Sequence, residues 1–466
     1  MKKSVFLGLA TAAVSLSSCN LNPSGNAGAV AVLTTNADGT KLLESSTTAF
    51  AGPTMAAVKV VVDDKQQFQT MEGFGYALTG GSAQVLYKMA PDKRKALLQE
   101  LFDTTGTALG ISYLRISIGA SDLDATVFSY DDLPAGKTDT ALASFSIDKD
   151  RSALIPVLKE ILAIRPDLRI MGSPWSPPVW MKDNDSSKGG HLLKKYYGVY
   201  AAYFVRYIKA YAAEGITIDA VTLQNEPEHG GNNPSLLMTA TEQAELIRDH
   251  VGPAFAAAGL KTKILAWDHN GNHPEYPITV LNDSAARKYV YGAAFHLYEG
   301  DETALSKVKT AHPDKALYFT EQWTGSKSDF AGDFKWHIKH IVIGTTRNWS
   351  SVVLEWNLAS DSTWNPHTPG GCTECKGALT IDGDQVKRNV SYYIIGQASR
   401  MIPPGSVRIS STEPDGLSTV AFKTPQGKTV LLVLNEGDQP REFTVVNGDK
   451  QFIQKIGAGS AITCAW

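Results

Sequence analysis

The stretch Ile218-Asp-Ala-Val-Thr-Leu-Gln-Asn-Glu-Pro-Glu228 decides how the chain is interpreted. Its first half is mostly apolar and rich in β-branched residues, a pattern typical of a buried strand. Pro227 has no backbone donor and biases Glu226 away from the helical region, so the strand ends there. The stretch therefore predicts a strand that presents Asn225 and Glu226 at its carboxyl end. On this stretch alone, a buried strand followed by an ordinary polar turn is the alternative.

Seven further strand patterns alternate with helical patterns around this stretch, as parallel sheets require. The eight predicted strands are 73–78, 111–118, 168–172, 218–224, 263–267, 291–297, 316–320 and 351–356, and the helical patterns include 93–102, 152–164, 192–213, 242–258 and 334–346. This order predicts an α/β fold, a (β/α)8 TIM barrel over residues 73–395. A doubly wound open sheet is the alternative, but the third glycine of its phosphate-binding pattern is missing after Gly73 and Gly75.

The pattern changes after Pro403-Pro404. Short β-type runs follow at 406–411, 417–423, 429–434 and 442–446, divided by Gly, Pro and Asn turns, with no helical pattern between them. They predict a β-sandwich. A single sheet of this size buries little apolar surface, so we expect the early strand at 58–63 to join it. The side domain is predicted to comprise residues 56–72 and 396–466.

The first 18 residues have the pattern of a targeting segment. Lys2 and Lys3 precede a short apolar run that is too short for a permanent membrane span. Leu16-Ser-Ser-Cys19 resembles a bacterial lipoprotein cleavage box, which predicts a lipid on Cys19 and a location at the cell envelope; an ordinary secretory peptide is the alternative. Residues 19–55 are rich in Ser, Thr, Gly, Asn and Ala and predict a flexible tether.

Charge and cysteine content narrow the possible functions. Lys and Arg number 44 and Asp and Glu 47, so nothing indicates attraction to nucleic acid or to anionic lipid. Cys372 and Cys375 form a C-x-x-C pair that is compatible with a disulfide, half a metal site or two thiols. A four-thiolate zinc site needs a second pair, which the sequence lacks, and export favours the disulfide. Cys464 is then unpaired and expected to be buried.

A second carboxylate follows the seventh predicted strand, in Leu317-Tyr-Phe-Thr-Glu-Gln-Trp323. All strands of a parallel barrel end at one rim, so Glu321 and Glu226 are expected to converge there. Two carboxylates about 5 Å apart suit a retaining glycosidase, with one as nucleophile and the other as acid and then base. Repulsion between them raises one pKa and keeps that acid protonated near neutral pH. A single strand-end glutamate is equally compatible with a helix cap or a surface charge.

Other predicted strand ends carry aromatic and polar side chains, which suit the apolar faces and hydroxyl edges of sugars. Arg115 falls inside a strand, where it needs a partner, and Glu321 is the expected one. Asp122 either binds sugar hydroxyls or caps a helix. The remaining candidates for sugar binding are Trp175, Trp180, His296, Tyr298, Trp323, Trp356, Asn357, Trp364 and Asn365.

Five motifs together resemble glycoside hydrolase family thirty, the group that contains glucosylceramidases and endo-β-1,6-glucanases. They are MEGFGYALT at 71–79, SPWSPPVW at 173–180, QNEP at 224–227, FTE at 319–321 and WNLA at 356–359. The resemblance implies a barrel with a side sandwich, retention of configuration and no cofactor. It also implies that Glu226 is the acid/base, that Glu321 is the nucleophile and that Asn225 holds the 2-hydroxyl. The implied glucose subsite contains Arg115, Asp122, Trp175, Tyr298, Trp356, Trp364 and Asn365.

Two departures bear on the substrate. Leu297 stands where glucosylceramidases tend to carry Trp, and residues 366–375 resemble bacterial members that cleave β-1,6-glucan. We therefore predict a monomeric endo-β-1,6-glucanase acting on a β-glucan polysaccharide or oligosaccharide. The alternatives are a glucosylceramidase and a glycan-binding lipoprotein without catalysis. Metal-dependent hydrolysis is not favoured, because no His pair has helical ligand spacing, and we expect no metal or cofactor.

Overall fold

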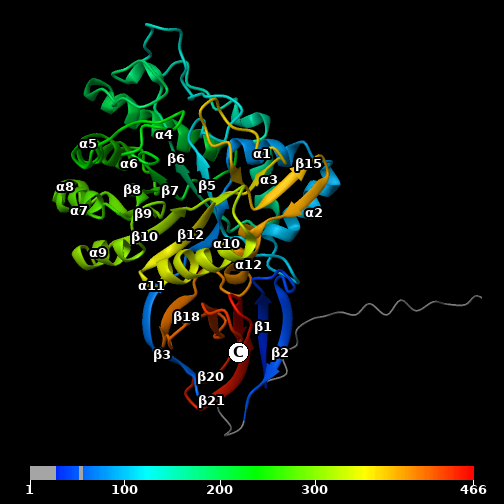
Figure 1. The fold of residues 1–466 in the computed structure, drawn as a ribbon. Coiled ribbons are helices and arrows are strands. Elements are labelled where there is room, and N and C mark those ends of the chain that lie inside the picture. The colour runs from blue at the N-terminus through cyan, green and yellow to red at the C-terminus, as the bar shows by residue number, and fades with distance from the viewer. Residues whose placement is uncertain (1–27, 52–55) are drawn as a thin grey trace, which may run out of the picture.

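The computed structural model describes residues 28–51 and 56–466 and contains a closed barrel and a β-sandwich (Figure 1). The barrel strands are β4 (Gly73–Ala77), β5 (Tyr113–Ser117), β6 (Arg169–Ser173), β7 (Ala220–Thr222), β8 (Lys263–Asn270), β9 (Val290–His296), β10 (Ala316–Glu321) and β12 (Ser350–Asn357). They are parallel and pair in chain order, and β12 closes the barrel against β4. The predicted (β/α)8 TIM barrel is confirmed, and each of its eight predicted strands overlaps an observed one.

Helices surround these strands (Figure 1). They are α1 (Gly80–Tyr87), α2 (Pro91–Phe102), η1 (Asp150–Ser152), α3 (Leu154–Ile164), η2 (Val179–Met181), η3 (Lys194–Tyr196), α4 (Tyr197–Ala213), α5 (Ala240–Leu246), η4 (Ile247–Val251), α6 (Gly252–Ala257), α7 (Glu275–Asn282), α8 (Ser284–Arg287), α9 (Thr303–Ala311), α10 (Phe330–His337), η5 (Ile338–Gly344), α11 (Thr345–Arg347) and α12 (Val390–Ser399). The predicted helices at 242–258 and 334–346 are each interrupted by a π-helical segment, η4 and η5.

Two apolar layers hold the barrel together. Inside it, side chains from successive strands form one buried cluster, which includes Tyr113, Met171, Leu265, Tyr318 and Leu354. Outside it, strands and helices share a larger core, because amphipathic helices such as α3 turn their apolar face inward. The barrel is therefore a packed core, and functional side chains are confined to its ends.

The sandwich strands are β1 (Ala29–Thr35), β2 (Glu44–Ala49), β3 (Lys59–Thr70), β17 (Val407–Ser411), β18 (Leu417–Lys423), β19 (Thr429–Asn435), β20 (Arg441–Asn447), β21 (Lys450–Ile456) and β22 (Ala461–Ala465). Their order is β2-β1-β22-β19-β18-β17-β3-β20-β21. The long strand β3 pairs with β17 along one part and with β20 along another, so it links the two layers. The prediction that the early strand joins the C-terminal strands is confirmed.

The prediction of a flexible tether at 19–55 is wrong for most of residues 28–51, the part of that segment that the structure describes. Strand β1 pairs with β22, and β2 pairs with β1. The sequence AVAVLTT of β1 buries Val30 and Leu33 completely, so this segment contributes to both cores. Strand β2 was not predicted because it is rich in Ser and Thr, and a strand with exposed faces resembles a polar linker in composition. Cys19 and the predicted signal segment lie outside the described residues.

Helix α12 joins the barrel to the sandwich. The predicted domain boundary between residues 395 and 396 cuts through this helix, whose residues remain buried to its end. Gln397 is fully buried and accepts a hydrogen bond from Thr35 Oγ1 at 2.8 Å. Its amide donates to the Leu33 carbonyl at 3.0 Å and to Thr463 Oγ1 at 2.9 Å. The buried hydrogen bonds of Gln397 thus connect the sandwich to the barrel.

Small sheets shape the segment after β12. Strand β11 (Thr324–Gly325) pairs with β14 (Cys375–Lys376), while β13 (Ala359–Ser360) pairs with β15 (Leu379–Asp382) and β15 with β16 (Gln385–Arg388). They bring residues 366–376 to the rim of the barrel. Across the part of the chain that the structure describes, no helix has the length and hydropathy needed to cross a membrane.

Candidate active site

Glu226 and Glu321 both lie at the carboxyl-end rim of the barrel, as predicted, beside strands that β8 and β9 separate. Glu321 is the last residue of β10, and Glu226 follows β7; both are buried. Glu226 has a φ of 47°, so it avoids the right-handed helical region, as Pro227 requires, by adopting the left-handed conformation. Its N–H donates to the Asp268 carbonyl at 3.0 Å, which fixes this conformation.

The two carboxylates meet around His296, the last residue of β9. His296 Nδ1 lies 3.2 Å from Glu226 Oε1 and 3.9 Å from Glu321 Oε1. One oxygen of each carboxylate and one ring nitrogen of His296 all lie within 4.8 Å of one another. This separation matches the close carboxylate pair of retaining glycosidases, because inverting enzymes leave about 6.5–9.5 Å for a water molecule.

Arg115 is the cation of the site. It is fully buried, and its Nη1 donates to Glu321 Oε2 at 2.6 Å, so the predicted pairing is confirmed. Its Nη2 donates to Asn225 Oδ1 at 2.6 Å and to Asp268 Oδ2 at 2.8 Å. The guanidinium lies over the ring of Trp175, 4.9 Å from its centroid. Arg115 therefore holds Glu321, Asn225 and Asp268 in one fixed arrangement.

Asp268 is the most important site residue that the sequence analysis missed. It is fully buried, and its Oδ1 lies 3.1 Å from His296 Nε2 and accepts from Thr320 Oγ1 at 2.7 Å. Arg115 and these partners hold the pKa of Asp268 far below its ordinary value despite the opposing effect of burial. Asp268 thereby orients the imidazole of His296 toward Glu226.

The pKa shifts of the two glutamates have opposite directions. Burial raises the pKa of Glu321, and Glu226 and Asp268 add to this, against the opposing charges of His296 and Arg115. Burial also acts on Glu226, but the hydrogen bond and charge of His296 outweigh it and lower its pKa. The expectation that one carboxyl has a raised pKa is met, yet that carboxyl is Glu321, because His296 lies closer to Glu226.

His296 supplies the positive charge between the carboxylates. Burial alone would lower its pKa, but Glu321, Asp268 and Glu226 raise it to about 9. The ring is fully buried, and its predicted contact with substrate stays a prediction. Its place between Asp268 and Glu226 suits it to position Glu226.

A cavity of about 350 Å³ opens above this network. Trp175 and Trp356 form one side of it, with ring centroids 5.5 Å apart and planes inclined by 30°. Tyr298 donates its hydroxyl to Glu321 Oε1 at 2.9 Å. Aromatic faces beside buried acids fit a sugar ring held over the two carboxylates. The lining residues are Asp122, Trp175, Glu226, His229, Asn232, His269, Asn270, Tyr298, Glu299, Glu321, Trp323, Trp356, Cys372 and Cys375.

The Cys372–Cys375 pair forms a disulfide, as predicted, and it lines the cavity. The N–H of Cys372 donates to Asp122 Oδ2 at 3.2 Å, so the disulfide loop fixes this carboxylate. Burial, together with the charges of Glu321 and Glu226, raises the pKa of Asp122 to about 7. Asp122 therefore lies where it can bind a sugar hydroxyl in either protonation state. Cys464 is a buried free thiol, as expected.

The structure separates the predicted sugar-binding residues into three groups. Asp122, Trp175, Tyr298, Trp323 and Trp356 line the cavity, whereas Arg115, Asn225 and His296 lie directly beneath it. Trp364 and Asn365 are outside the lining, and Asn365 hydrogen-bonds Thr363 and Asp361 in its own loop.

Five further lining residues follow strand ends that the sequence analysis had placed but not used. They are His229, Asn232, His269, Asn270 and Glu299. The signal was the run Asp-His-Asn directly after the predicted fifth strand, where β8 continues to Asn270. Trp267 and Asp268 have positive φ values of 72° and 79°, and the pairing register shifts there, so a bulge redirects these side chains.

Glu226, His296 and Glu321 are also the grouping within residues 28–51 and 56–466 whose atoms could ligate a metal ion. These atoms already pair with one another and with Arg115, Tyr298 and Asp268. A metal ion would have to displace those hydrogen bonds.

Comparison with protein families decides the classification. The model of the glycosyl hydrolase family 30 TIM-barrel domain matches residues 71–402. That of the family 30 β-sandwich domain matches residues 405–464. The chain belongs to glycosyl hydrolase family 30. It is a glycoside hydrolase.

Several family 30 proteins resemble the chain over most of its length. An endo-1,6-β-D-glucanase of Neurospora crassa is 36% identical over 81% of this chain and 82% of its own. The lysosomal acid glucosylceramidase of Mus musculus is 29% identical over 89% of this chain and 85% of its own. The solved structure of an endo-β1,6-glucanase is 35% identical with a TM-score of 0.89, covering 94% of this chain and 99% of that one.

Proposed function

We propose that this family 30 enzyme is a retaining endo-β-1,6-glucanase. The observation that supports retention is the separation of Glu226 and Glu321, whose nearest ligand atoms lie within 4.8 Å. That distance lets one carboxylate reach the anomeric carbon while the other reaches the glycosidic oxygen. It leaves too little room for a water molecule to attack from the opposite face.

The first half of the reaction forms a covalent intermediate. Glu226, as the acid, donates its proton to the glycosidic oxygen, and the bond from that oxygen to the anomeric carbon breaks. An oxygen of Glu321 attacks the anomeric carbon, so an ester forms while the leaving sugar departs with the proton. Arg115 and Tyr298 donate hydrogen bonds to Glu321 and hold its carboxylate in line.

The second half releases the sugar. Glu226, now a carboxylate, takes a proton from water, and the resulting hydroxide attacks the anomeric carbon. The ester bond breaks, Glu321 is freed as a carboxylate, and the product keeps its β configuration. Asn225, held by Arg115, is positioned for the sugar 2-hydroxyl.

The starting proton must lie on Glu226, although the pKa of Glu226 is lowered and that of Glu321 is raised. The donors Arg115 and Tyr298 favour an ionised Glu321, so movement of the proton to Glu226 accompanies substrate binding. His296, whose Nδ1 lies 3.2 Å from Glu226 Oε1, influences which of the two carboxyl groups carries the proton.

A second cavity supports a polymeric substrate. It measures about 790 Å³ and shares His229, His269, Asn270 and Glu299 with the catalytic cavity. A glucan chain needs such a continuous space, because sugar units extend on both sides of the cleaved bond in endo hydrolysis. The greater identity to the fungal endo-1,6-β-D-glucanase than to the mouse glucosylceramidase favours a β-1,6-glucan as that polymer.

The substrate is tested by comparing turnover on a linear β-1,6-glucan with turnover on glucosylceramide. We expect the glucan to yield a ladder of β-1,6-linked oligosaccharides at early times, which marks internal cleavage. Release of glucose alone would contradict the endo mode. Faster turnover of glucosylceramide than of the glucan would identify the alternative, a glucosylceramidase.

We further propose that the enzyme is a monomer anchored at the bacterial cell envelope by a lipid on Cys19. Support comes from the sequence Leu16-Ser-Ser-Cys19 after a short apolar run. Expressed in a bacterium, the wild-type chain should enter the detergent phase and carry an acyl mass at Cys19. Cys19→Ala should enter the aqueous phase, and an unmodified wild-type Cys19 would overturn this proposal.

A further inference from the structure

The amino-terminal end of the barrel contains a cavity of about 770 Å³ that the glycosidase mechanism does not use. It lies where the strands begin, since Glu72 precedes β4, Arg169 starts β6 and Lys263 starts β8. Strand β10 connects it to the catalytic site, from Ala316 in this cavity to Glu321 at the rim. At about 3.3 Å per residue, that strand keeps the two sites roughly 17 Å apart.

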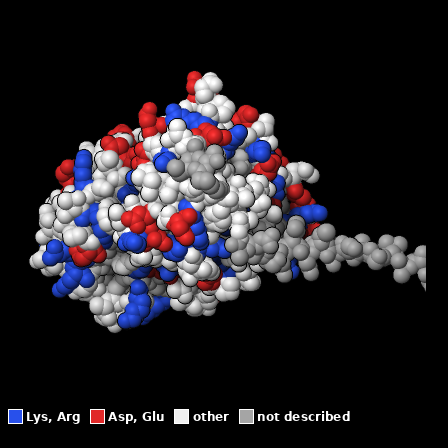
Figure 2. Space-filling model, turned by 90° about the horizontal axis from the view of Figure 1, so that it is seen from below, with Lys and Arg blue, Asp and Glu red and all other residues white. Residues whose placement is uncertain are grey.

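The charge of this cavity is opposite to that of the chain. Six cationic side chains line it, namely Arg169, Lys261, Lys263, Lys288, Lys309 and Lys315. Its acidic side chains are Glu72 and Asp314, so the lining has a net formal charge of +4, whereas the whole chain has −3. The surface seen from below carries both signs interspersed (Figure 2), so a generally basic surface does not explain this concentration.

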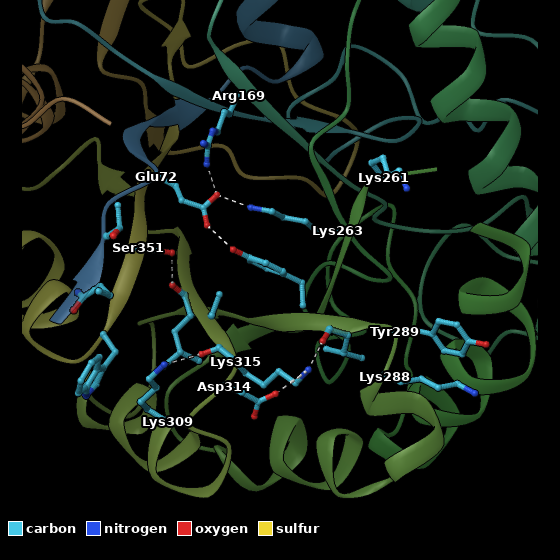
Figure 3. A pocket seen from close by; sticks show the side chains of 17 residues that line it. Glu72, Arg169, Lys261, Lys263, Lys288, Tyr289, Lys309, Asp314, Lys315 and Ser351 are labelled. Atoms are coloured by element: carbon cyan, nitrogen blue, oxygen red, sulfur yellow. Dashed lines mark hydrogen bonds and ion pairs between the residues drawn. The ribbon is translucent and has the colours of Figure 1, made fainter. Parts of the chain in front are cut away.

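Part of this charge is neutralised within the cavity. Glu72 lies between two cations, with its Oε2 paired to Arg169 and 2.7 Å from Lys263 Nζ (Figure 3). Asp314 pairs with Lys315 at 3.3 Å. These contacts leave one net positive charge in the paired part, and they order the floor of the cavity.

The other three lysines have no such partner. Among the described residues, no carboxylate is within ion-pair distance of Lys261, Lys288 or Lys309. Lys261 and Lys288 are exposed at the edge of the cavity. Lys309 is half-buried, donates to the Lys315 carbonyl at 3.1 Å and lies 5.2 Å from the centre of the Trp349 ring. Burial lowers the pKa of Lys309, and the more distant charge of Asp314 only partly opposes this shift.

We propose that this lower cavity binds a phosphate-bearing ligand. A phosphate carries up to two charges and several acceptor oxygens, which lysines on different elements can approach from different directions. Lys261 precedes β8, Lys288 follows α8 and Lys309 lies in α9, so they surround a ligand rather than line one helix (Figure 3). The hollow shape favours a discrete group that enters the cavity, either a free phosphorylated molecule or the headgroup of an anionic lipid.

Isothermal titration calorimetry with inorganic pyrophosphate at low ionic strength tests the proposal on the full folded enzyme. We expect saturable binding that weakens with added salt, because counter-charges screen the lysines. Lys261→Glu/Lys288→Glu should weaken it at least tenfold. The matched control, Lys95→Glu/Lys209→Glu, changes the net charge equally at exposed positions on α2 and α4 and should change binding less than twofold.

Co-sedimentation with vesicles separates the two sources of phosphate. Binding to phosphatidylglycerol vesicles but not to phosphatidylcholine, lost in Lys261→Glu/Lys288→Glu alone, identifies a headgroup. Pyrophosphate binding without vesicle binding identifies a free ligand. Absence of both, or an equal loss in the control pair, would overturn the proposal and leave the cavity as a solvated basic surface.

Discussion

At the carboxyl ends of the barrel strands, the buried cations Arg115 and His296 each have carboxylates beside them. At their amino ends, Lys261, Lys288 and Lys309 have no such partner among the described residues. Arg115 and His296 are thus held in place by buried carboxylates of the same network. Groups that are fixed in advance cost little reorganisation during a reaction, which suits catalysis of a neutral sugar. Cations without partners suit the binding of an anion.

The same strands support both ends because their middle is packed. The cluster that includes Tyr113, Met171 and Leu265 fills the barrel between the two sites. Changes at one end should therefore have little effect on the other. The predictions below test this independence, from the largest expected effect to the smallest.

Replacement of the nucleophile should have the largest effect. Glu321→Gln should lower kcat on β-1,6-glucan at least ~10³-fold, because a neutral amide cannot form the covalent ester. Pyrophosphate binding at the lower cavity should stay unchanged in the same variant. Steady-state kinetics with reducing-sugar detection measures the first effect, and near-normal turnover would show that Glu321 is misassigned.

Replacement of the acid/base should have an effect that depends on the leaving group. Glu226→Ala should lose roughly 10²- to 10⁴-fold on the glucan, whose leaving group needs a proton. An aryl β-glucoside with an acidic phenol should form the intermediate without that help. Added azide should then restore turnover and give a β-glucosyl azide, since azide needs no general base. An α-glucosyl azide, or no rescue, would contradict this role.

Asp122 should make stability depend on pH. Its folded pKa of about 7 exceeds that of the unfolded chain, so its favourable contribution is complete below about pH 4 and is lost as pH rises toward 7. Asp122→Asn removes this loss. Relative to wild type, the free energy of unfolding of the variant should therefore increase by roughly 3 kcal/mol between pH 4.5 and pH 7.5. Urea unfolding of both proteins at the two pH values measures this change in the free energy of unfolding. An equal difference between variant and wild type at both pH values would show that the pKa of Asp122 is not raised.

Charge reversal at the lower cavity should have the smallest effect on catalysis. Lys261→Glu/Lys288→Glu should leave kcat and KM on the glucan within about twofold, because these lysines lie at the opposite end of a packed barrel. The same kinetic assay measures it beside the Lys95→Glu/Lys209→Glu control. A large loss confined to the first pair would show that the two ends are coupled.

The sequence predicted the barrel and the convergence of Glu226 and Glu321 at its rim, for a physical reason. Buried parallel strands are continuous apolar runs, and Glu321 ends one of them while Glu226 lies shortly after another. Asp268 was missed because β8 continues past its predicted end through a bulge that only the folded chain reveals. The direction of the pKa shifts also depends on three-dimensional distances, above all that from His296 to Glu226.

The N-terminal strands were missed for a different reason. Strand β1 pairs with β22, at the far end of the chain, and a non-local pairing leaves no local signal beyond a short apolar alternation. Strand β2 is polar and exposed, so composition could not distinguish it from a linker. The predicted roles of Trp364 and Asn365 came from their place after the eighth predicted strand and from the resemblance, and neither residue lines the cavity.

Proton NMR of the products at the first minutes of hydrolysis tests the central claim most directly. A β-1,6-glucan cleaved by Glu226 and Glu321 through a covalent intermediate should release the β-anomer first, with the α-anomer appearing later by mutarotation. Initial release of the α-anomer would contradict the account, because it would mean that water attacks directly and that the two carboxylates do not act as nucleophile and acid/base.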